Sequence, residues 1–111
     1  MANLFNKGDA LPLTLDFSVN DGETTRSLYE FVQQAGVTEI EFTLGSNTYT
    51  LSAGTITLDE DEYKIFVSQE QSFALNVLTN YQIRLKVGDT IVCSSDIMTV
   101  SIGGVLSGVE L

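Results

Sequence analysis

The sequence predicts an all-β sandwich of six to eight short antiparallel strands with one or two short helices. Three observations lead to this prediction. Apolar and polar residues alternate with a period of two in several segments, turn-forming residues recur roughly every eight to twelve positions, and only two short runs show helical spacing. Because alternation marks a strand with one buried and one solvated face, the segments together indicate stacked sheets.

The first strand is predicted at residues 11–19, where three leucines, a phenylalanine and a valine alternate with Pro12 and polar residues. The leucines are expected to point inward. Pro12 has no N–H to donate to a sheet ladder, so it is expected at the start of the strand or on a sheet edge. An Asn-Asp-Gly turn at 20–22 ends the strand.

A short helix is predicted at residues 28–35, where the apolar residues follow helical spacing. Ser27 and Glu30 form a capping box, and Gly36 stands where a left-handed C-terminal cap is expected. A second capping box at 68–71 opens at most two further helical turns. Helices this short require packing against the sheets to be stable.

The middle of the chain carries further short strands, predicted at 37–44, 48–53, 55–58 and 63–67. Ile56 and Leu58 are expected to share one buried face. The four adjacent carboxylates at 59–62 repel one another and predict a solvated loop. This loop lacks the glycine and the distal glutamate of an EF-hand, so a Ca²⁺ site is the weaker interpretation.

The clearest strand signal lies at residues 81–87, followed by a turn at 88–89 and a second apolar arm. This pattern predicts a β-hairpin. Its register is open: a two-residue loop places Leu85 opposite Val92, whereas a three-residue loop with a bulge places Leu85 opposite Cys93.

The spacing of the strands is typical of an immunoglobulin-like β-sandwich with Greek-key connections. The sequence has no Cys…Trp…Cys pattern, so an antibody-type domain is not expected. We expect three parts: an N-terminal arm at 1–10, the sandwich at 11–102, and an apolar C-terminal tail at 103–111.

Composition limits the possible partners. The 111 residues suit one domain, and the single Cys93 excludes an intrachain disulfide framework. Fifteen acidic and five basic residues give a formal net charge of −10, which opposes binding to nucleic acid and to anionic membranes. Neither a secretion signal nor an apolar run of membrane-spanning length is visible, so synthesis in the cytoplasm is expected.

No constellation of residues predicts chemistry, and no catalytic residue, cofactor or metal site is expected. The chain has no histidine, so Cys93 lacks the usual base that would activate it as a nucleophile. Glu39 and Glu41 lie on one strand face, but their alternation predicts exposure to solvent and no cleft. The chain is therefore not expected to be an enzyme.

The termini hold the candidate protein-interface residues, which are apolar side chains in otherwise polar or glycine-containing segments. They are Leu4, Phe5, Val105, Leu106, Val109 and Leu111. Such residues are expected to dock either on the domain's own surface or on a neighbouring subunit, and the sequence favours neither alternative.

The order of parts resembles small structural proteins of tailed bacteriophages. It is carried by a Ser-Gln-Glu-Gln-Ser turn at 68–72, the strand 81–86 followed by Gly-Asp at 88–89, and Ser-Asp-Ile at 95–97 leading to Val100. The layout is similar to that of the immunoglobulin-like N-terminal domain of phage upper baseplate proteins. Those proteins continue into a long helical or receptor-binding region that this sequence lacks, so head decoration and fibre anchoring are equally expected roles.

The resemblance implies a virion protein made in the host cytoplasm, which assembles with capsid or tail proteins and with copies of itself. The alternative is a β-sandwich that binds a ligand or carbohydrate through loops at one end. That alternative requires an exposed cluster of Tyr49, Tyr63 and Tyr81, whereas each lies on the apolar phase of its strand and is expected in the core.

Overall fold

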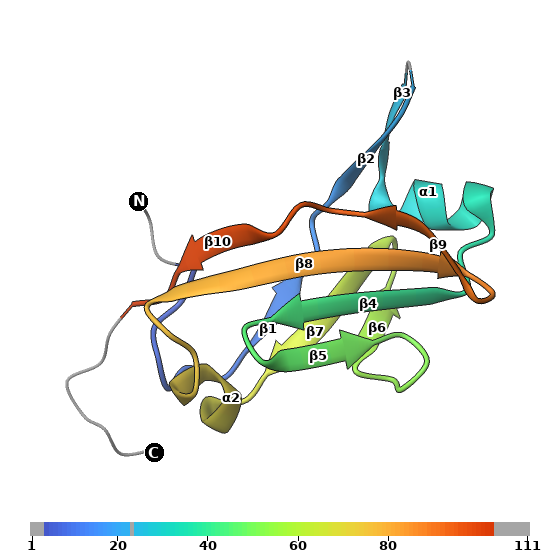
Figure 1. Ribbon diagram of the computed structural model, residues 1–111. Coiled ribbons are helices and arrows are strands. Elements are labelled where there is room, and N and C mark those ends of the chain that lie inside the picture. The colour runs from blue at the N-terminus through green and yellow to red at the C-terminus, as the bar shows by residue number, and fades with distance from the viewer. Residues whose placement is uncertain (1–3, 23, 104–111) are drawn as a thin grey trace.

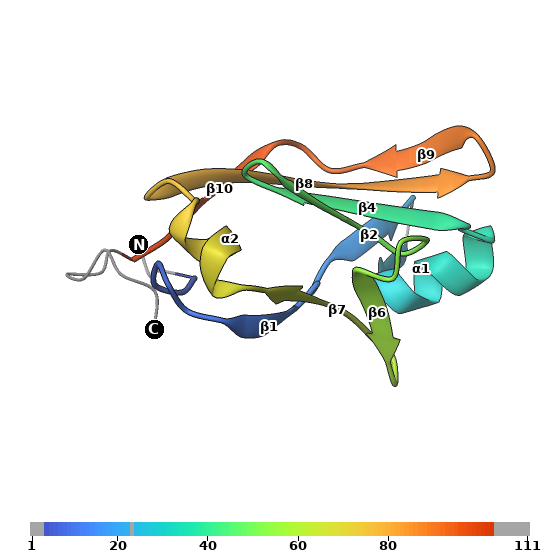
Figure 2. The same cartoon turned by 90° about the horizontal axis from the view of Figure 1, so that it is seen from below.

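The computed structural model describes residues 4–22 and 24–103, which form two facing antiparallel sheets with two short helices (Figures 1 and 2). Sheet one has the order β1-β7-β6, from β1 (Leu11–Thr14), β7 (Glu62–Val67) and β6 (Ile56–Asp59). Sheet two contains β4 (Glu39–Leu44), β5 (Asn47–Thr50), β8 (Leu78–Val87), β9 (Thr90–Ser94) and β10 (Met98–Ser101). A separate hairpin joins β2 (Ser18–Asp21) to β3 (Thr24–Ser27).

The strand order is that of an immunoglobulin-type sandwich. Such a sandwich packs strands B, E and D against strands C′, C, F and G. Here β1, β7 and β6 correspond to B, E and D, while β5, β4, β8 and the β9–β10 pair correspond to C′, C, F and G. The predicted all-β sandwich is confirmed, with ten strands in the described residues instead of six to eight.

The prediction of one strand over residues 11–19 is wrong, because the chain leaves sheet one after Thr14. The N–H of Leu15 still donates to the carbonyl of Tyr63 at 2.8 Å. Phe17 then turns toward sheet two, where its ring centroid lies 6.0 Å from that of Phe42 and 6.3 Å from that of Tyr81. This aromatic packing interrupts the strand, and residues 18–21 pair with β3 instead.

Both predicted helices are confirmed. In α1 (Leu28–Ala35), the Glu30 N–H donates to Ser27 Oγ, and the Ser27 N–H donates to Glu30 Oε1, both at 3.2 Å. Gly36 ends this helix with φ of 70°, a left-handed conformation that favours glycine. In α2 (Gln69–Phe73), residues 68 and 71 form the second capping box.

The final hairpin combines features of the two registers that the sequence left open. A two-residue loop joins Val87 to Thr90, as in the first alternative. A register shift in β9 then places Leu85 opposite Cys93, as in the second. The bulge keeps Cys93 on the face of Leu85, and β8 begins at Leu78, three residues earlier than predicted.

Three details of the middle segment differ from the predictions. The strand predicted at 48–53 ends at Thr50, because residues 51–54 turn toward sheet one. Leu58 is 47% exposed at the sheet edge, so only Ile56 of that pair is buried. The carboxylates at 59–62 are solvent-exposed as predicted, but only residues 60–61 form the turn, since the outer two belong to β6 and β7.

The core lies between the two sheets and is closed at one end by α1 (Figure 2). Phe42 in β4 is its aromatic centre, with ring contacts to Phe17, Tyr49 and Tyr81 at centroid distances of 6.0, 6.4 and 6.1 Å. Tyr49 and Tyr63 are buried and Tyr81 is half-buried, which confirms that these tyrosines pack in the core.

Candidate protein-interaction surfaces

The N-terminal arm docks on the domain itself beside the end of β10. The Leu4 N–H donates to the Ser101 carbonyl at 2.8 Å, and the Gly103 N–H donates to the Phe5 carbonyl at 2.7 Å. Asn6 and Gly103 form a parallel bridge. The Phe5 ring belongs to the buried core and is only 7% exposed.

This docking separates the two predicted interface residues of the arm. Phe5 is a core residue of its own domain, so it offers no surface to a partner in this conformation. Leu4 is 43% exposed and remains accessible. The other four predicted interface residues, Val105, Leu106, Val109 and Leu111, lie outside the described residues.

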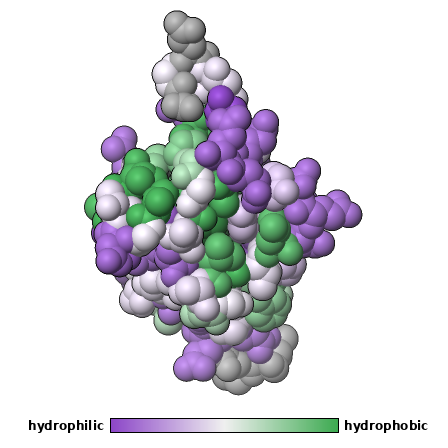
Figure 3. All heavy atoms as spheres, turned by 90° about the vertical axis from the view of Figure 1, so that its right-hand side faces the viewer, coloured by the Kyte–Doolittle hydropathy of each residue, from purple (hydrophilic) through white to green (hydrophobic). Residues whose placement is uncertain are grey.

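Several large apolar side chains of the described residues are exposed, some at sheet edges and others, such as Phe66 in the central strand β7, on an outer face or outside the strands. They are Leu4, Leu58, Phe66, Val77, Leu78, Ile91, Val92 and Ile97. Figure 3 views the end of the sandwich that carries α1 and the β8–β9 turn, and shows apolar side chains reaching the surface among hydrophilic ones. Single exposed apolar residues are normal on the surface of a monomer. Only a group of them indicates a site of protein interaction.

Three of these side chains group on the outer edge of sheet two, which we call the β9 edge (residues 90–97). Ile91 is 44% exposed, Val92 is 45% exposed and Ile97 is 68% exposed. The sequence pattern predicts these residues only as part of a hairpin arm. The uncharged run from residue 90 to residue 95 was the available signal, because natural edge strands are normally protected by charges.

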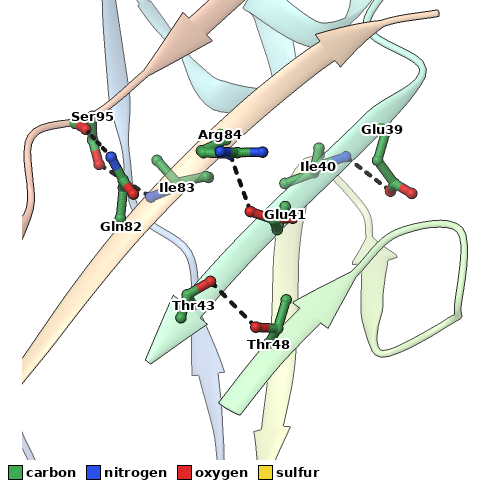
Figure 4. A network of polar contacts seen from close by, with 9 residues as sticks. All are labelled: Glu39, Ile40, Glu41, Thr43, Thr48, Gln82, Ile83, Arg84 and Ser95. Atoms are coloured by element: carbon green, nitrogen blue, oxygen red, sulfur yellow. Dashed lines mark hydrogen bonds and ion pairs between the residues drawn. The ribbon is translucent and has the colours of Figure 1, made fainter. Parts of the chain in front are cut away.

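The outer face of sheet two is polar and largely occupied by contacts within the sheet (Figure 4). The contacts are Glu41 to Arg84 at 3.1 Å, Thr43 to Thr48 at 3.4 Å, and Gln82 Nε2 to the Ser95 carbonyl at 2.9 Å. The carboxylates of the predicted exposed pair are therefore both engaged, Glu41 with a cation and Glu39 with backbone and hydroxyl donors. This face presents no aromatic platform for a sugar.

Glu39 holds the loop that connects the two sheets. Its Oε1 accepts hydrogen bonds from the N–H groups of Ser52 and Ile40, each at 3.0 Å, and its Oε2 accepts one from the Ser52 hydroxyl. Burial acts to raise the pKa of Glu39, but the hydrogen bonds from Ser52 and the backbone outweigh it, so the pKa is lowered.

We expect this loop clamp to make stability sensitive to acid. A carboxylate whose pKa is lower in the folded state stabilises the fold above its unfolded pKa, which is about 4.3. That contribution is lost as the pH falls through the folded-state pKa. In urea unfolding, Glu39→Gln is expected to be less stable than wild type at pH 7, with a smaller difference at pH 3. Ser52→Ala is the matched variant that removes the hydroxyl donor. If Glu39→Gln lowers the free energy of unfolding equally at both pH values, the Glu39 carboxylate does not stabilise the loop through its charge.

The cavities of the described chain are open and shallow. One cavity, of about 440 Å³, lies between β5 and β7 and includes Tyr49, Lys64 and Phe66 in its lining. Another, about 160 Å³, lies beneath β9. Across residues 4–22 and 24–103, no group of three or more Cys, Asp or Glu side chains is arranged to hold a metal ion. Cys93 is a free, half-buried thiol opposite Leu85.

The fold and surfaces define an immunoglobulin-type β-sandwich that exposes several large apolar side chains, three of them along the β9 edge. No family model, no curated protein and no solved structure matches the chain. Within the described part of the chain, neither helix has the length and apolar character needed to cross a membrane.

Proposed function

We propose that this protein is a non-enzymatic structural protein of a tailed-phage virion, which assembles through protein–protein contacts. It serves as a head decoration, as a fibre anchor, or as a component of the baseplate or tail. It is made in the host cytoplasm. The proposal combines the resemblance in the order of parts with one surface observation. That observation is the group of exposed apolar side chains along the β9 edge, where residues 90–95 carry no charge.

Strand edges are the elements that suit this role. An edge strand has N–H and C=O groups that can pair with another chain, and neighbouring pockets then select the side chains of that chain. The exposed apolar residues Ile91, Val92 and Ile97 add area that is removed from water when a partner covers the edge.

The charge of the chain favours protein partners over nucleic acid. Binding to a phosphate backbone depends on Lys and Arg that displace counterions, and this chain has five such residues against fifteen Asp and Glu. Lys64 is engaged in an ion pair with Asp59, and Arg84 in one with Glu41. Other virion proteins and copies of this chain are therefore the proposed partners.

The proposed function is tested by particle association. Purified virions of the phage whose genome encodes this sequence are expected to contain the protein, as measured by mass spectrometry of gradient-purified particles. Recombinant protein is expected to co-sediment with particles assembled without it. Consistent absence of the protein from virions, together with failure to co-sediment, would contradict the proposal.

Three variants test whether the accessible apolar side chains carry this binding. Leu4→Asp and Ile97→Asp replace accessible apolar side chains, whereas Thr99→Asp adds the same charge at an exposed polar position of β10. At least one of the first two is expected to reduce co-sedimentation at least tenfold, and the third is expected to leave it unchanged. If all three variants co-sediment with particles equally well, Leu4 and Ile97 are not part of the interface.

A further inference from the structure

The β9 edge is open to an added strand. Among the described residues β9 pairs only with β8. The Ser95 N–H donates to the Ile83 carbonyl at 2.9 Å, and Leu85 lies opposite Cys93. Because bonded and non-bonded pairs alternate along an antiparallel ladder, the N–H and C=O of Ser94 point away from β8. They are positioned to continue the ladder into another chain.

The outer strands of sheet one carry features that block strand addition. Leu15 donates its N–H to Tyr63 in β7, and residues along β1 alternate between facing β7 and facing outward. The backbone nitrogen of Pro12 therefore faces outward, where it has no hydrogen to donate to an added strand. The edge strand β6 ends in Asp59, which is followed directly by three further carboxylates. The β9 strand has neither a proline nor a charge, so its short length and the bulge between Ile91 and Cys93 are the edge protections that it carries.

A small apolar groove lies beneath the β9 edge. Its volume is about 160 Å³, and its lining includes Val19, Leu28, Ile83 and Cys93. Small-molecule sites are typically about 300–1,000 Å³, so this groove suits single side chains of a neighbouring strand better than a ligand. The β2–β3 hairpin projects past this edge of sheet two (Figure 1), so an added strand would also contact the hairpin.

The local charge determines which chain can bind along the β9 edge. Two copies of a chain with net charge −10 repel each other, so they can approach only where the surface lacks acidic excess. Next to β9 on the outer face of β8 lie Arg84 and Lys86, two of the five basic residues of the chain. Arg84 pairs with Glu41 and Lys86 lies opposite Glu39, so this part of the face carries no net charge, and Asp89 and Asp96 flank β9; the β6–β7 turn, by contrast, is strongly acidic.

We propose that a second copy of this chain adds its β9 antiparallel to this β9, which extends sheet two across a two-fold axis into a continuous sheet. The inference rests on the proposed function, because it specifies which protein contact the assembly uses. Each copy offers the other the same uncharged strand, the same outward N–H and C=O groups and the same apolar groove. Such self-complementarity is what a two-fold interface requires.

The first test measures self-association of the full chain by sedimentation equilibrium. Wild type is expected to form a concentration-dependent dimer, and Val92→Lys is expected to weaken dimerisation at least tenfold. Leu58→Lys introduces the same charge on β6 and is expected to dimerise as wild type does. It is a matched control because Leu58 is 47% exposed and Val92 is 45% exposed. Far-ultraviolet circular dichroism confirms that both variants are folded.

A second test determines which strands meet. In a Cys93→Ser background, single cysteines are introduced at positions 91, 92 and 94. At least one of them is expected to give a disulfide-linked dimer, because a residue near the two-fold axis lies close to the same residue of the other copy. Thr57→Cys on β6 is expected to give none. Wild-type protein that stays monomeric, or a dimer unaffected by Val92→Lys, would overturn the inference.

Failure of this inference differs from failure of the proposed function. If wild type is monomeric in solution but co-sediments with virions, only the β9 pairing is wrong. If it dimerises through β9 but is absent from virions, the pairing stands and the virion role is wrong.

Discussion

Replacing Phe42 by alanine is expected to lower the free energy of unfolding by about 3–5 kcal/mol, the usual cost of removing a buried phenylalanine. The ring is 5% exposed and contacts three other aromatic rings, so its loss leaves a cavity at the centre of the sandwich. Because small domains are stable by about 5–15 kcal/mol, this change approaches the total stability. Urea unfolding followed by circular dichroism measures it.

Phe66→Ala is the matched control for this experiment. Phe66 lies in β7, opposite Pro12, and is 59% exposed. Its replacement is expected to cost about 1 kcal/mol or less, because little area leaves water when it folds. Equal losses for the two variants would contradict the position of the core.

Gly45→Ala is expected to destabilise the protein by about 2–5 kcal/mol through two separate effects. Gly45 has φ of 62°, and a side chain in this left-handed region costs about 1–2 kcal/mol. A Cβ at this position would also lie 2.8 Å from Leu75 Cδ2 and 3.4 Å from Thr79 Cγ2. Overpacking of this kind costs about 1–3 kcal/mol more.

Gly88→Ala separates the two effects. Gly88 occupies the same first position of a two-residue hairpin loop and has φ of 59°, but a Cβ there would meet nothing within 4 Å. We expect it to cost about 1–2 kcal/mol, from backbone strain alone. If both variants lose the same stability in urea unfolding, the contact of Gly45 with Leu75 does not constrain the loop.

The sequence predicted those parts of the fold that depend on local pattern. Alternation in β8 and β4 follows from one buried and one solvated face, and both capping boxes follow from hydrogen bonds within four residues. It missed β3, whose polar residues Thr24–Ser27 have no apolar alternation. It also joined β1 to β2, because the ring packing of Phe17 that divides them involves distant residues.

The candidate surfaces were harder to predict. An apolar residue near a terminus has the same sequence signal whether it is buried or exposed, and only the bonds between the arm and residues 101–103 place Phe5 in the core. Similarly, the accessibility of Val92 depends on which strand lies at the edge of sheet two. Strand order is set by contacts between distant segments, which the local pattern does not encode.

The pairing of Asn6 with Gly103 has a consequence for biosynthesis. It joins positions separated by nearly the whole described chain, so it contributes contacts of high contact order, which form slowly and late. During translation, residues near the N-terminus leave the ribosome long before their partners are made. A nascent chain arrested before Ser101 therefore exposes Phe5 to solvent and to chaperones until the final residues of this pairing emerge.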